Sequence, residues 1–429
     1  MTPLNKGFSK PRRGGNGNCG EHSVQNVKQR TSNTQAQPPH FVQPPNKQTS
    51  PTWQADFNTP PCEATNQIEK ACANPDRTLR AKPRKAKTKP LYAALDLGTN
   101  NCRLLIATPT RPGHFRVIDG FSRIVRLGEG LTHSGLLQQN AMNRTIDALK
   151  ICSDKLHQKP IRRLRLVATE ACRSAENGLQ FIQRVRRETG LTLEIVDRKT
   201  EAQLAVSGCG SLIEHNANAI VVFDIGGGSS EIALIDISKK RSPRLAEHIT
   251  AWTSLPVGVV TLTERFESTP IDLEGFEKMK AHVRGLLASF NDRYKLGTLA
   301  NEPHFYLLGT SGTITTLAGL HLELTRYDRR KVDGIWMSSE EVSETTNRLL
   351  SWDLNQRIAN PCIGRDRADL VLAGCAILEA IREVWPSEWL RVADRGLREG
   401  ILLDLMSRDG AWRHRRNISH KYIHSPPTH

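Results

Sequence analysis

The chain has 429 residues, 38% of them hydrophobic, and a formal net charge of +16. This length accommodates two or three domains, and the lack of any apolar run of about 18 residues argues against a membrane-spanning helix. The nine cysteines contain no CxxC pair, which argues against a zinc ribbon, and their odd number favours free thiols. The N-terminus also lacks the apolar core of a signal peptide. We therefore expect a soluble, cytoplasmic protein.

The positive charge is concentrated at the two ends of the chain. Residues 1–90 carry a net charge of +10 and residues 407–429 carry +4, which leaves only +2 for the residues between them. Residues 1–90 also contain 12 of the 23 prolines, so we expect a disordered, basic, proline-rich tail over residues 1–88. That tail is either a solvated segment or an arm that attracts polyanions. The near-neutral middle of the chain argues against nucleic acid as the main ligand.

Strands and helices alternate from Leu91 onward. In the first half we expect a strand, turn and strand over residues 91–110, helices over 141–156, 177–190 and 201–206, and strands over 164–169 and 191–197. In the second half we expect a strand, loop and strand over 220–234 and a strand, loop and helix over 304–319. Helices over 273–290, 370–384 and 397–406, a strand over 390–394 and a capping box at Ser338 and Glu341 complete the pattern. This alternation predicts the α/β class.

Two hairpins repeat the same pattern of residues. AALDLGTNNCRLLIA and VVFDIGGGSSEIALI each place an aspartate at the end of an apolar strand and a glycine two residues later. Asp96 and Asp224 are 128 residues apart, a spacing that predicts duplicated halves with a cleft between them. Glycines allow backbone N–H groups to approach a phosphate closely. An aspartate beside them becomes reasonable if Mg²⁺ lies between carboxylate and phosphate.

A third glycine turn, GTSGT over residues 309–313, follows an expected strand and precedes an expected helix. A helix N-terminus there could hold another anion, although an ordinary loop explains the turn equally simply. Neither the GxGxxG dinucleotide fingerprint in its strand–helix setting nor the GxxxxGK[ST] phosphate loop is present. The phosphate chemistry is therefore of another kind.

Four segments together resemble the exopolyphosphatase/guanosine pentaphosphate phosphohydrolase (Ppx/GppA) family: ALDLGTNNCRLLIA, ATEACRSAEN, FDIGGGSSEIAL and DRGLREGIL. VRLGEGL, LPVGVVTLTERF and RADLVLAG agree with that family, and the match runs in order from about Leu91 to Met406. The resemblance implies the actin-like ATPase superfold, with two duplicated actin-like (ribonuclease H-like) domains and a cleft between them. Here these would be domain I over 89–212 and domain II over 213–406, followed by a basic tail over 407–429.

The resemblance also implies Mg²⁺-dependent hydrolysis of terminal phosphoanhydride bonds, with polyphosphate or guanosine pentaphosphate as the substrate, and it leaves a homodimer open. The family's catalytic base is the glutamate of an EA pair that opens a helix, which is Glu201 here. Asp96, Asp224 and Glu231 would hold Mg²⁺ or its water. Phosphate contacts are expected from Gly98, Thr99, Asn100, Asn101, Arg103, Arg173, Gly226, Gly227, Gly228, Ser229, Ser230, Gly309, Ser311 and Gly312.

Structural roles could also explain several of these residues. Glu201 fits the first turn of a helix, where the helix dipole favours a carboxylate. Arg173 could be a surface arginine and Glu231 a solvent-facing strand residue. Arg398 and Glu399 are interpreted as a structural pair beside the last helix, and Cys102 and Cys172 as small packing residues.

The chain departs from the family pattern in two ways. Thr200 precedes Glu201 where many relatives have a second acid, which removes a charge that would raise the pKa of the glutamate. The recognisable fold also stops near Met406, without the helical C-terminal domain of the longer relatives, so this resembles a short form. Two alternatives stay open: an actin-like ATPase or kinase, and a non-catalytic protein that binds an alarmone or nucleic acid.

Overall fold

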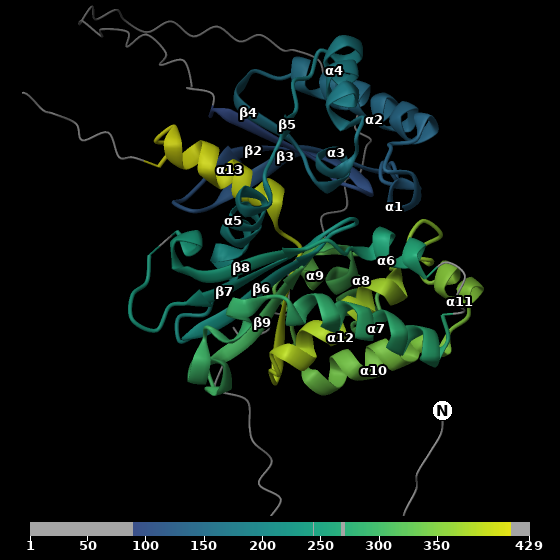
Figure 1. Ribbon diagram of the computed structural model, residues 1–429. Coiled ribbons are helices and arrows are strands. Elements are labelled where there is room, and N and C mark those ends of the chain that lie inside the picture. The colour runs from purple at the N-terminus through teal and green to yellow at the C-terminus, as the bar shows by residue number, and fades with distance from the viewer. Residues whose placement is uncertain (1–88, 243, 267–270, 413–429) are drawn as a thin grey trace, which may run out of the picture. The chain divides into compact units, whose positions relative to one another are not determined.

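A computed structural model of the protein describes residues 89–242, 244–266 and 271–412. All of them belong to one compact unit, Pro75–His429. The tail expected over residues 1–88, and residues 413–429 of the expected C-terminal tail, lie outside the described residues. The two sheets of this unit are visible in Figure 1 as the groups of strands labelled β2–β5 and β6–β9.

The first sheet has five strands in the order β3-β2-β1-β4-β5. Its strands are β1 Leu91–Leu97, β2 Asn101–Pro109, β3 Phe115–Ile124, β4 Ile161–Ala168 and β5 Glu194–Ile195. The accompanying helices are α1 Leu131–Ser134, α2 Gln139–His157, α3 Glu170–Ser174, α4 Gly178–Thr189 and α5 Arg198–Cys209, followed by a 3-10 turn over Gly210–Leu212. β1, β2 and β3 are antiparallel, whereas β4 and β5 run parallel to β1.

The second sheet has six strands in the order β10-β11-β9-β6-β7-β8. Its strands are β6 Ala219–Ile225, β7 Ser230–Asp236, β8 Ile249–Leu255, β9 Phe305–Thr310, β10 Trp336–Ser338 and β11 Trp389–Ala393. The helices in this half of the chain are α6 Val259–Arg265, α7 Leu273–Ala288, α8 Ser311–His321, α9 Arg329–Val332, α10 Ser339–Ser351, α11 Leu354–Ala359, α12 Val371–Val384 and α13 Leu397–Arg408. Three further 3-10 turns cover Leu245–His248, Asn291–Tyr294 and Gly297–Asn301.

The two sheets share one topology, which confirms the duplicated α/β architecture. In each sheet three consecutive antiparallel strands are followed by parallel strands on the far side of the first strand. β1 and β6 occupy equivalent central places, and the tight turns after them are alike. Gly98 N donates to Asn101 O over 2.9 Å, and Gly226 N donates to Ser229 O over the same distance.

Helix α5 lies between the two sheets. Its Leu204 packs with Tyr92 and Ala94 of β1 in one apolar cluster, whereas its Val206 joins Val222 of β6 in another. Successive strand residues face opposite sides of a sheet. Ala93, Leu95 and Leu97 of β1 therefore pack on the other face, against α2 and α4. A residue near the start of α5 is therefore held between the two halves by apolar burial on both sides.

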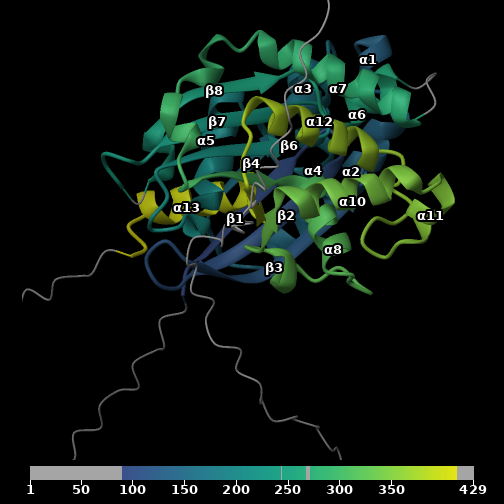
Figure 2. The ribbon, with the colours of Figure 1, turned by 90° about the horizontal axis from the view of Figure 1, so that it is seen from below.

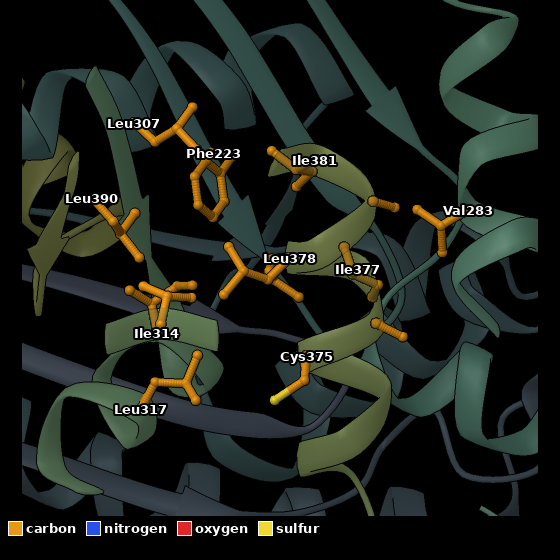
Figure 3. Close-up of a cluster of buried hydrophobic side chains, with 14 of the residues drawn as sticks. Phe223, Val283, Leu307, Ile314, Leu317, Cys375, Ile377, Leu378, Ile381 and Leu390 are labelled. Atoms are coloured by element: carbon orange, nitrogen blue, oxygen red, sulfur yellow. The ribbon is translucent and has the colours of Figure 1, made fainter. Parts of the chain in front are cut away.

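The largest apolar core covers the other face of the second sheet. Phe223 of β6, Leu307 of β9 and Ile314 of α8 face Leu378 of α12, with Val283 of α7 beyond it (Figure 3). The helical spacing of the apolar residues predicts a helix over residues 370–384, and α12 forms there with ten buried residues. This core fixes the ends of β6 and β9, where the loops expected to bind phosphate begin.

The last helix departs from the expected division of the chain. α13 was assigned to domain II, yet its Leu397, Ile401 and Met406 pack against the first sheet in the same cluster as Tyr92. In Figures 1 and 2 the yellow α13 lies beside α5, away from α10 and α12. The fold also continues past Met406, because Asp409 accepts hydrogen bonds from the Tyr92 hydroxyl and from Arg163. The boundaries of the two domains otherwise stay a prediction.

Most of the helices and strands expected from the sequence are present, and a few differ in length or were not expected. The strand expected over 191–197 shrinks to Glu194–Ile195, and β3, β8 and β10 were not expected. Ser338 and Glu341 form the predicted capping box. Asn177 stands at the N-cap of α4, but its side chain pairs with the Leu137 backbone in place of capping the helix.

The six cysteines within residues 89–412 that the structure describes are all free and buried. Cys102 and Cys172 are among them, which agrees with their interpretation as packing residues. No helix in the described part of the chain is long and apolar enough to span a membrane.

Candidate active site

One cavity of about 570 Å³ lies where the ends of both central strands meet. It is lined by 15 of the 18 residues predicted for the site. These are Asp96, Gly98, Thr99, Asn100, Asn101, Arg103, Glu201, Asp224, Gly226, Gly227, Gly228, Ser229, Glu231, Ser311 and Gly312. The two hairpins, far apart in the sequence, therefore contribute to a single site.

Register places a charged partner opposite each aspartate. Asp96 lies opposite Arg103 in the β1–β2 pair, and Asp224 lies opposite Glu231 in the β6–β7 pair. The first hairpin therefore brings a cation beside its carboxylate, whereas the second brings another acid. Glu231 is only 4% exposed, so it does not face solvent. Its Oε1 accepts hydrogen bonds from the hydroxyls of Ser229 and Ser254.

The glycines of the second hairpin allow the two loops to approach each other. A Cβ at Gly228 would lie 2.6 Å from Thr99 Oγ1, and one at Gly227 would lie 3.0 Å from Thr99 Cβ. Glycine is therefore required here for close packing of loop against loop, in addition to any contact with a phosphate.

Ser230 and Gly309, two of the three remaining predicted residues, point away from the cavity. Ser230 is fully buried and its hydroxyl donates to Val257 O over 2.7 Å. Gly309 lies inside β9, where a Cβ would lie 2.6 Å from the Phe223 ring. The cavity lining does not include them, and their packing gives them structural roles.

Arg173, the third remaining residue, does not line the cavity but is hydrogen-bonded to two carboxylates. Its Nη1 donates to Glu201 Oε2 over 2.9 Å and to Val196 O over 2.7 Å, and its Nε donates to Glu170 Oε2 over 3.0 Å. Glu170 also accepts from Arg198 and from Ser174. Arg173 is 15% exposed, so it is not a surface arginine.

Sequence reasoning missed Glu170, which is buried and lines the same cavity as Glu201. Burial alone would raise the pKa of Glu170, but hydrogen bonds from Ser174 and Arg173 outweigh it, so the pKa is lowered. The only signal in the sequence is the position of Glu170 in ATEACR, three residues before Arg173. That spacing brings two side chains to one face of a helix.

Five acids that line the cavity have raised pKa values, and burial is the largest cause for each: Asp96, Glu201, Asp224, Glu231 and Asp394. Burial raises the pKa of Asp224 to about 7, and the nearby Glu231 and Asp96 add to the effect. Burial and the Glu231 charge likewise raise the pKa of Glu201 well above its usual range, although Arg173 opposes this. Carboxylates arranged this way favour a cation that would neutralise them.

Asp96 and Asp224 fit a divalent cation bound together with phosphate. Both aspartates line the cavity, and carboxylate oxygens are ligands that Mg²⁺ prefers. Within the described residues, no group of three or more His, Cys, Asp and Glu side chains is arranged to hold a metal ion by itself. In the usual Mg²⁺ site of a protein, one or two carboxylates share the ion with water and phosphate oxygens.

Five arginines line the cavity, and two of them, Arg329 and Arg395, form ion pairs with Glu399 and Asp333. Of the other three, only Arg103 was predicted to contact phosphate. Arg367 and Arg398 line the cavity with Arg103. Burial and the neighbouring Arg398 lower the pKa of Arg103, the nearby Asp96 opposes them, and Arg367 lowers it further. Within the part of the chain that the structure describes, no side-chain hydrogen bond or ion pair engages the guanidinium of Arg103 or of Arg367. Such clustered cations favour a polyanionic ligand.

Ser311 at the start of α8 has a left-handed backbone, with φ 87°. Its hydroxyl donates to Ile225 O over 2.6 Å, which ties the GTSGT turn to the end of β6. A non-glycine residue in this region is strained by about 1–3 kcal/mol, and such strain gathers at functional sites. The predicted third loop therefore meets the second hairpin at the cavity.

Arg398 and Glu399 lie at the start of α13, where Glu399 makes structural hydrogen bonds and both side chains line the cavity. Glu399 Oε2 accepts from Gly396 N over 3.0 Å at the start of α13, and its Oε1 accepts from Arg329 over 2.8 Å. Glu399 thus has the structural role that was predicted. Both members of the pair also line the cavity, which their sequence positions did not indicate.

Comparison with known proteins agrees with this geometry. The family model described as the Ppx/GppA phosphatase family matches residues 106–409. The chain belongs to the Ppx/GppA phosphatase family. The matched range begins after Arg103, so the first hairpin is assigned to the site from its place in the cavity.

The Ppx/GppA relatives match over most of their own length. Exopolyphosphatase 2 of Mycobacterium tuberculosis is 31% identical over 327 residues, which cover 73% of this chain and 98% of that protein. The crystal structure of the Aquifex aeolicus Ppx/GppA family member is 28% identical, with a TM-score of 0.61 over 75% of this chain and 99% of that one. An exopolyphosphatase structure from Cytophaga hutchinsonii shares the fold at 23% identity, with a TM-score of 0.65 over 75% and 98% of the two chains.

These likenesses confirm the expected family, the actin-like two-domain fold and a hydrolase of the acid-anhydride class. Membership in a phosphatase family also disfavours a purely structural or binding role for the cavity.

Proposed function

We propose that the protein is a Mg²⁺-dependent hydrolase that releases the terminal phosphate from inorganic polyphosphate, guanosine pentaphosphate, or both. The observation that carries this proposal is the composition of one cavity, in which a buried glutamate and two strand-end aspartates share the space with five arginines, among them Arg103, Arg367 and Arg398. A polyphosphate chain is a linear polyanion whose terminal unit must be bound by cations while a water molecule attacks it. The cavity contains groups suited to both tasks.

Glu201 would orient the attacking water and accept its proton. The first turn of α5 presents Glu201 to the cavity, and Arg173 fixes one of its oxygens, Oε2. The raised pKa of Glu201 suits a group that takes up a proton during the reaction. Arg173 would thereby set the direction of the carboxylate without touching the substrate.

Arg103, Arg367 and Arg398 would bind the phosphate oxygens, because a guanidinium contacts such oxygens through two N–H groups. Backbone and hydroxyl donors of the two hairpin loops would complete the anion site. Asp96 and Asp224 would hold Mg²⁺, with Glu231 nearby. When bound, Mg²⁺ neutralises charge on the phosphate oxygens that the carboxylates would otherwise repel.

The test is phosphate release in the presence of Mg²⁺ from long-chain polyphosphate, guanosine pentaphosphate and ATP. We expect hydrolysis of the first or second substrate, little hydrolysis of ATP, and a loss of about 100-fold or more in Glu201→Gln. Glu194→Gln is the matched control, because Glu194 lies seven residues away on β5 and, among the residues that the structure describes, its side chain pairs only with Arg165. Turnover of ATP alone would favour an actin-like ATPase or kinase, and an unimpaired Glu201→Gln enzyme would contradict the assigned base.

A further inference from the structure

The segment Val125–Gly130, here called the linking segment, joins β3 to α1 and carries the sequence VRLGEG. It belongs to a motif shared with the family, but it contributes no residue to the cavity lining. Its contacts nevertheless connect the first hairpin loop with the second half of the molecule.

Backbone hydrogen bonds tie the linking segment to the first loop. Val125 N and Arg126 N both donate to Asn100 O, over 2.9 and 3.0 Å, and Gly128 N donates to Thr99 O over 2.9 Å. A Cβ at Gly128 would lie only 2.3 Å from Thr99 Cγ2, so this contact requires glycine. Asn100 and Thr99 both line the cavity, and any displacement of the linking segment would move them.

Two further contacts reach the second half. Arg126 Nη2 donates to Asp366 O over 3.1 Å and forms an ion pair with Asp369 Oδ2 over 3.1 Å. Gly130 N donates to Glu264 Oε1 of α6 over 2.8 Å, and α1 and α6 lie side by side (Figure 1). The linking segment is therefore bonded to both halves.

The residues that Arg126 holds flank an arginine of the cavity. Asp366 and Asp369 stand on either side of Arg367 in the turn that leads into α12. The carbonyl of Arg367 accepts from Leu370 N and Val371 N, which fixes its backbone at the start of that helix. Arg126 is therefore bonded to the segment that carries Arg367, and Arg367 lines the cavity together with Thr99 and Asn100.

The backbone of Arg126 indicates that this placement is imposed by its surroundings. Arg126 has a φ of 46°, in the left-handed region that disfavours residues with side chains. The position would suit glycine better, yet the residue is an arginine whose guanidinium spans the two halves. Its exposure of 34%, and 39% for Asp369, means that the ion pair contributes little to folding stability. A role in positioning accounts for the strained backbone.

We propose that Arg126 is a positioning residue that, through Asp369 and the backbone of Asn100, holds Arg367 and the first hairpin loop at the separation needed to bind the substrate's phosphates. This inference rests on the proposed binding of phosphate in the cavity. Neither Arg126 nor Asp369 lines the cavity, so both act through other residues.

Asp369→Asn provides the decisive test, because two explanations predict opposite results. Removing a negative charge near a polyanion site would tighten binding if only the long-range field mattered. Loss of positioning would instead raise the KM for inorganic polyphosphate, by about tenfold, with kcat changed by less than about threefold. A KM that is unchanged or lower in Asp369→Asn overturns the proposal.

Two Arg126 variants separate positioning from misfolding. Arg126→Gly relieves the left-handed backbone and Arg126→Ala does not, but both remove the ion pair. We expect both to raise KM by about tenfold, and we expect the pair Arg126→Asp with Asp369→Arg to recover part of the loss. Arg165→Ala is the matched control, since it removes an ion pair of similar exposure that joins β4 to β5 within one sheet. A KM effect in Arg126→Ala that is absent in Arg126→Gly would show backbone damage and would also overturn the proposal.

Hydrogen exchange gives a readout that does not depend on activity. In Arg126→Gly and Asp369→Asn, amides of residues 98–103 and 364–371 should exchange at least about threefold faster than in the wild type, whereas Arg165→Ala should leave them unchanged. If the wild type hydrolyses no polyphosphate but these amides still respond, the proposed function fails and the coupling stands. If the wild type hydrolyses polyphosphate and these amides do not respond, the coupling fails and the function stands.

Discussion

At the scale of single residues, the cavity is defined by charges that constrain one another. Acids buried together raise each other's pKa, and three arginines stand beside them. Arg173 differs from these arginines, because its guanidinium is already bonded to the carboxylates of Glu201 and Glu170. The difference between an arginine that awaits a ligand and one already paired is invisible in the sequence, because it depends on which carboxylates the fold brings beside each guanidinium.

Arg173→Lys tests that distinction. A lysine cannot hold two carboxylates and a carbonyl with a rigid fork, so we expect Glu201 to lose its orientation. The expected result is a fall in kcat of about 10–100-fold with KM within about threefold, measured by steady-state phosphate release. A raised KM with an unchanged kcat would instead support the phosphate contact predicted from the sequence.

At the scale of elements, α5 and α13 approach so closely that their glycines have no space for a side chain. A Cβ at Gly400 of α13 would lie 2.0 Å from Leu204 O of α5, and one at Gly208 of α5 would lie 2.1 Å from Gly396 O. This contact supports the helix that presents Glu201. It also explains why a helix late in the chain packs with the first sheet.

We therefore expect Gly400→Ala to lower the free energy of unfolding by about 1–3 kcal/mol or more, because the backbones must separate. Gly285→Ala is the control, since a Cβ at Gly285 in α7 meets nothing within 4 Å. That change should be neutral or stabilising by up to about 1 kcal/mol. Urea denaturation of both variants measures the difference, and equal stabilities would contradict the close approach of α5 and α13.

At the scale of the whole molecule, the response to acid depends in part on ion pairs outside the cavity lining. A hydrogen bond from Lys155, with Lys159 and the Gly120 amide adding to it, lowers the pKa of Asp119 to about 2, although burial opposes this. The ordinary pKa of an aspartate is about 3.9. Because the pKa is lower in the folded state, the unfolded state binds the proton first. The stability from this pair is therefore present above about pH 4 and is lost as the pH falls towards 2.

Asp119→Asn should remove this dependence. We expect the stability of the wild type to fall more steeply than that of Asp119→Asn between about pH 4 and pH 2. Thermal unfolding at a series of pH values, with the two proteins compared at each pH, measures the effect. Parallel curves would show that the Lys155 and Lys159 pairs do not hold in solution.

Patterns that are local in the chain were enough to predict the two Asp–Gly hairpins and the alternation of strands and helices, whereas Glu201 was predicted as the base only through the family resemblance. A strand that ends in an aspartate followed by glycine has its consequences within a few residues, and the repeat of that pattern after 128 residues implies the duplication. For the same reason the capping box at Ser338 and Glu341 was predictable. The exposed strand β3, with no regular alternation of buried residues, was not.

Contacts between distant residues could only come from the folded chain. Arg367 enters the cavity because Arg126, 241 positions earlier, holds its neighbours, and α13 crosses back to the first sheet because its glycines fit against α5. Arg173 of α3 pairs with Glu170 of its own helix and with Glu201 of α5, because the fold brings α3 and the start of α5 within hydrogen-bonding distance. Side-chain type and spacing set which groups are available for catalysis. Which of them face a ligand depends on packing across the whole chain, because the burial and charge around each group arise from residues that are remote in sequence.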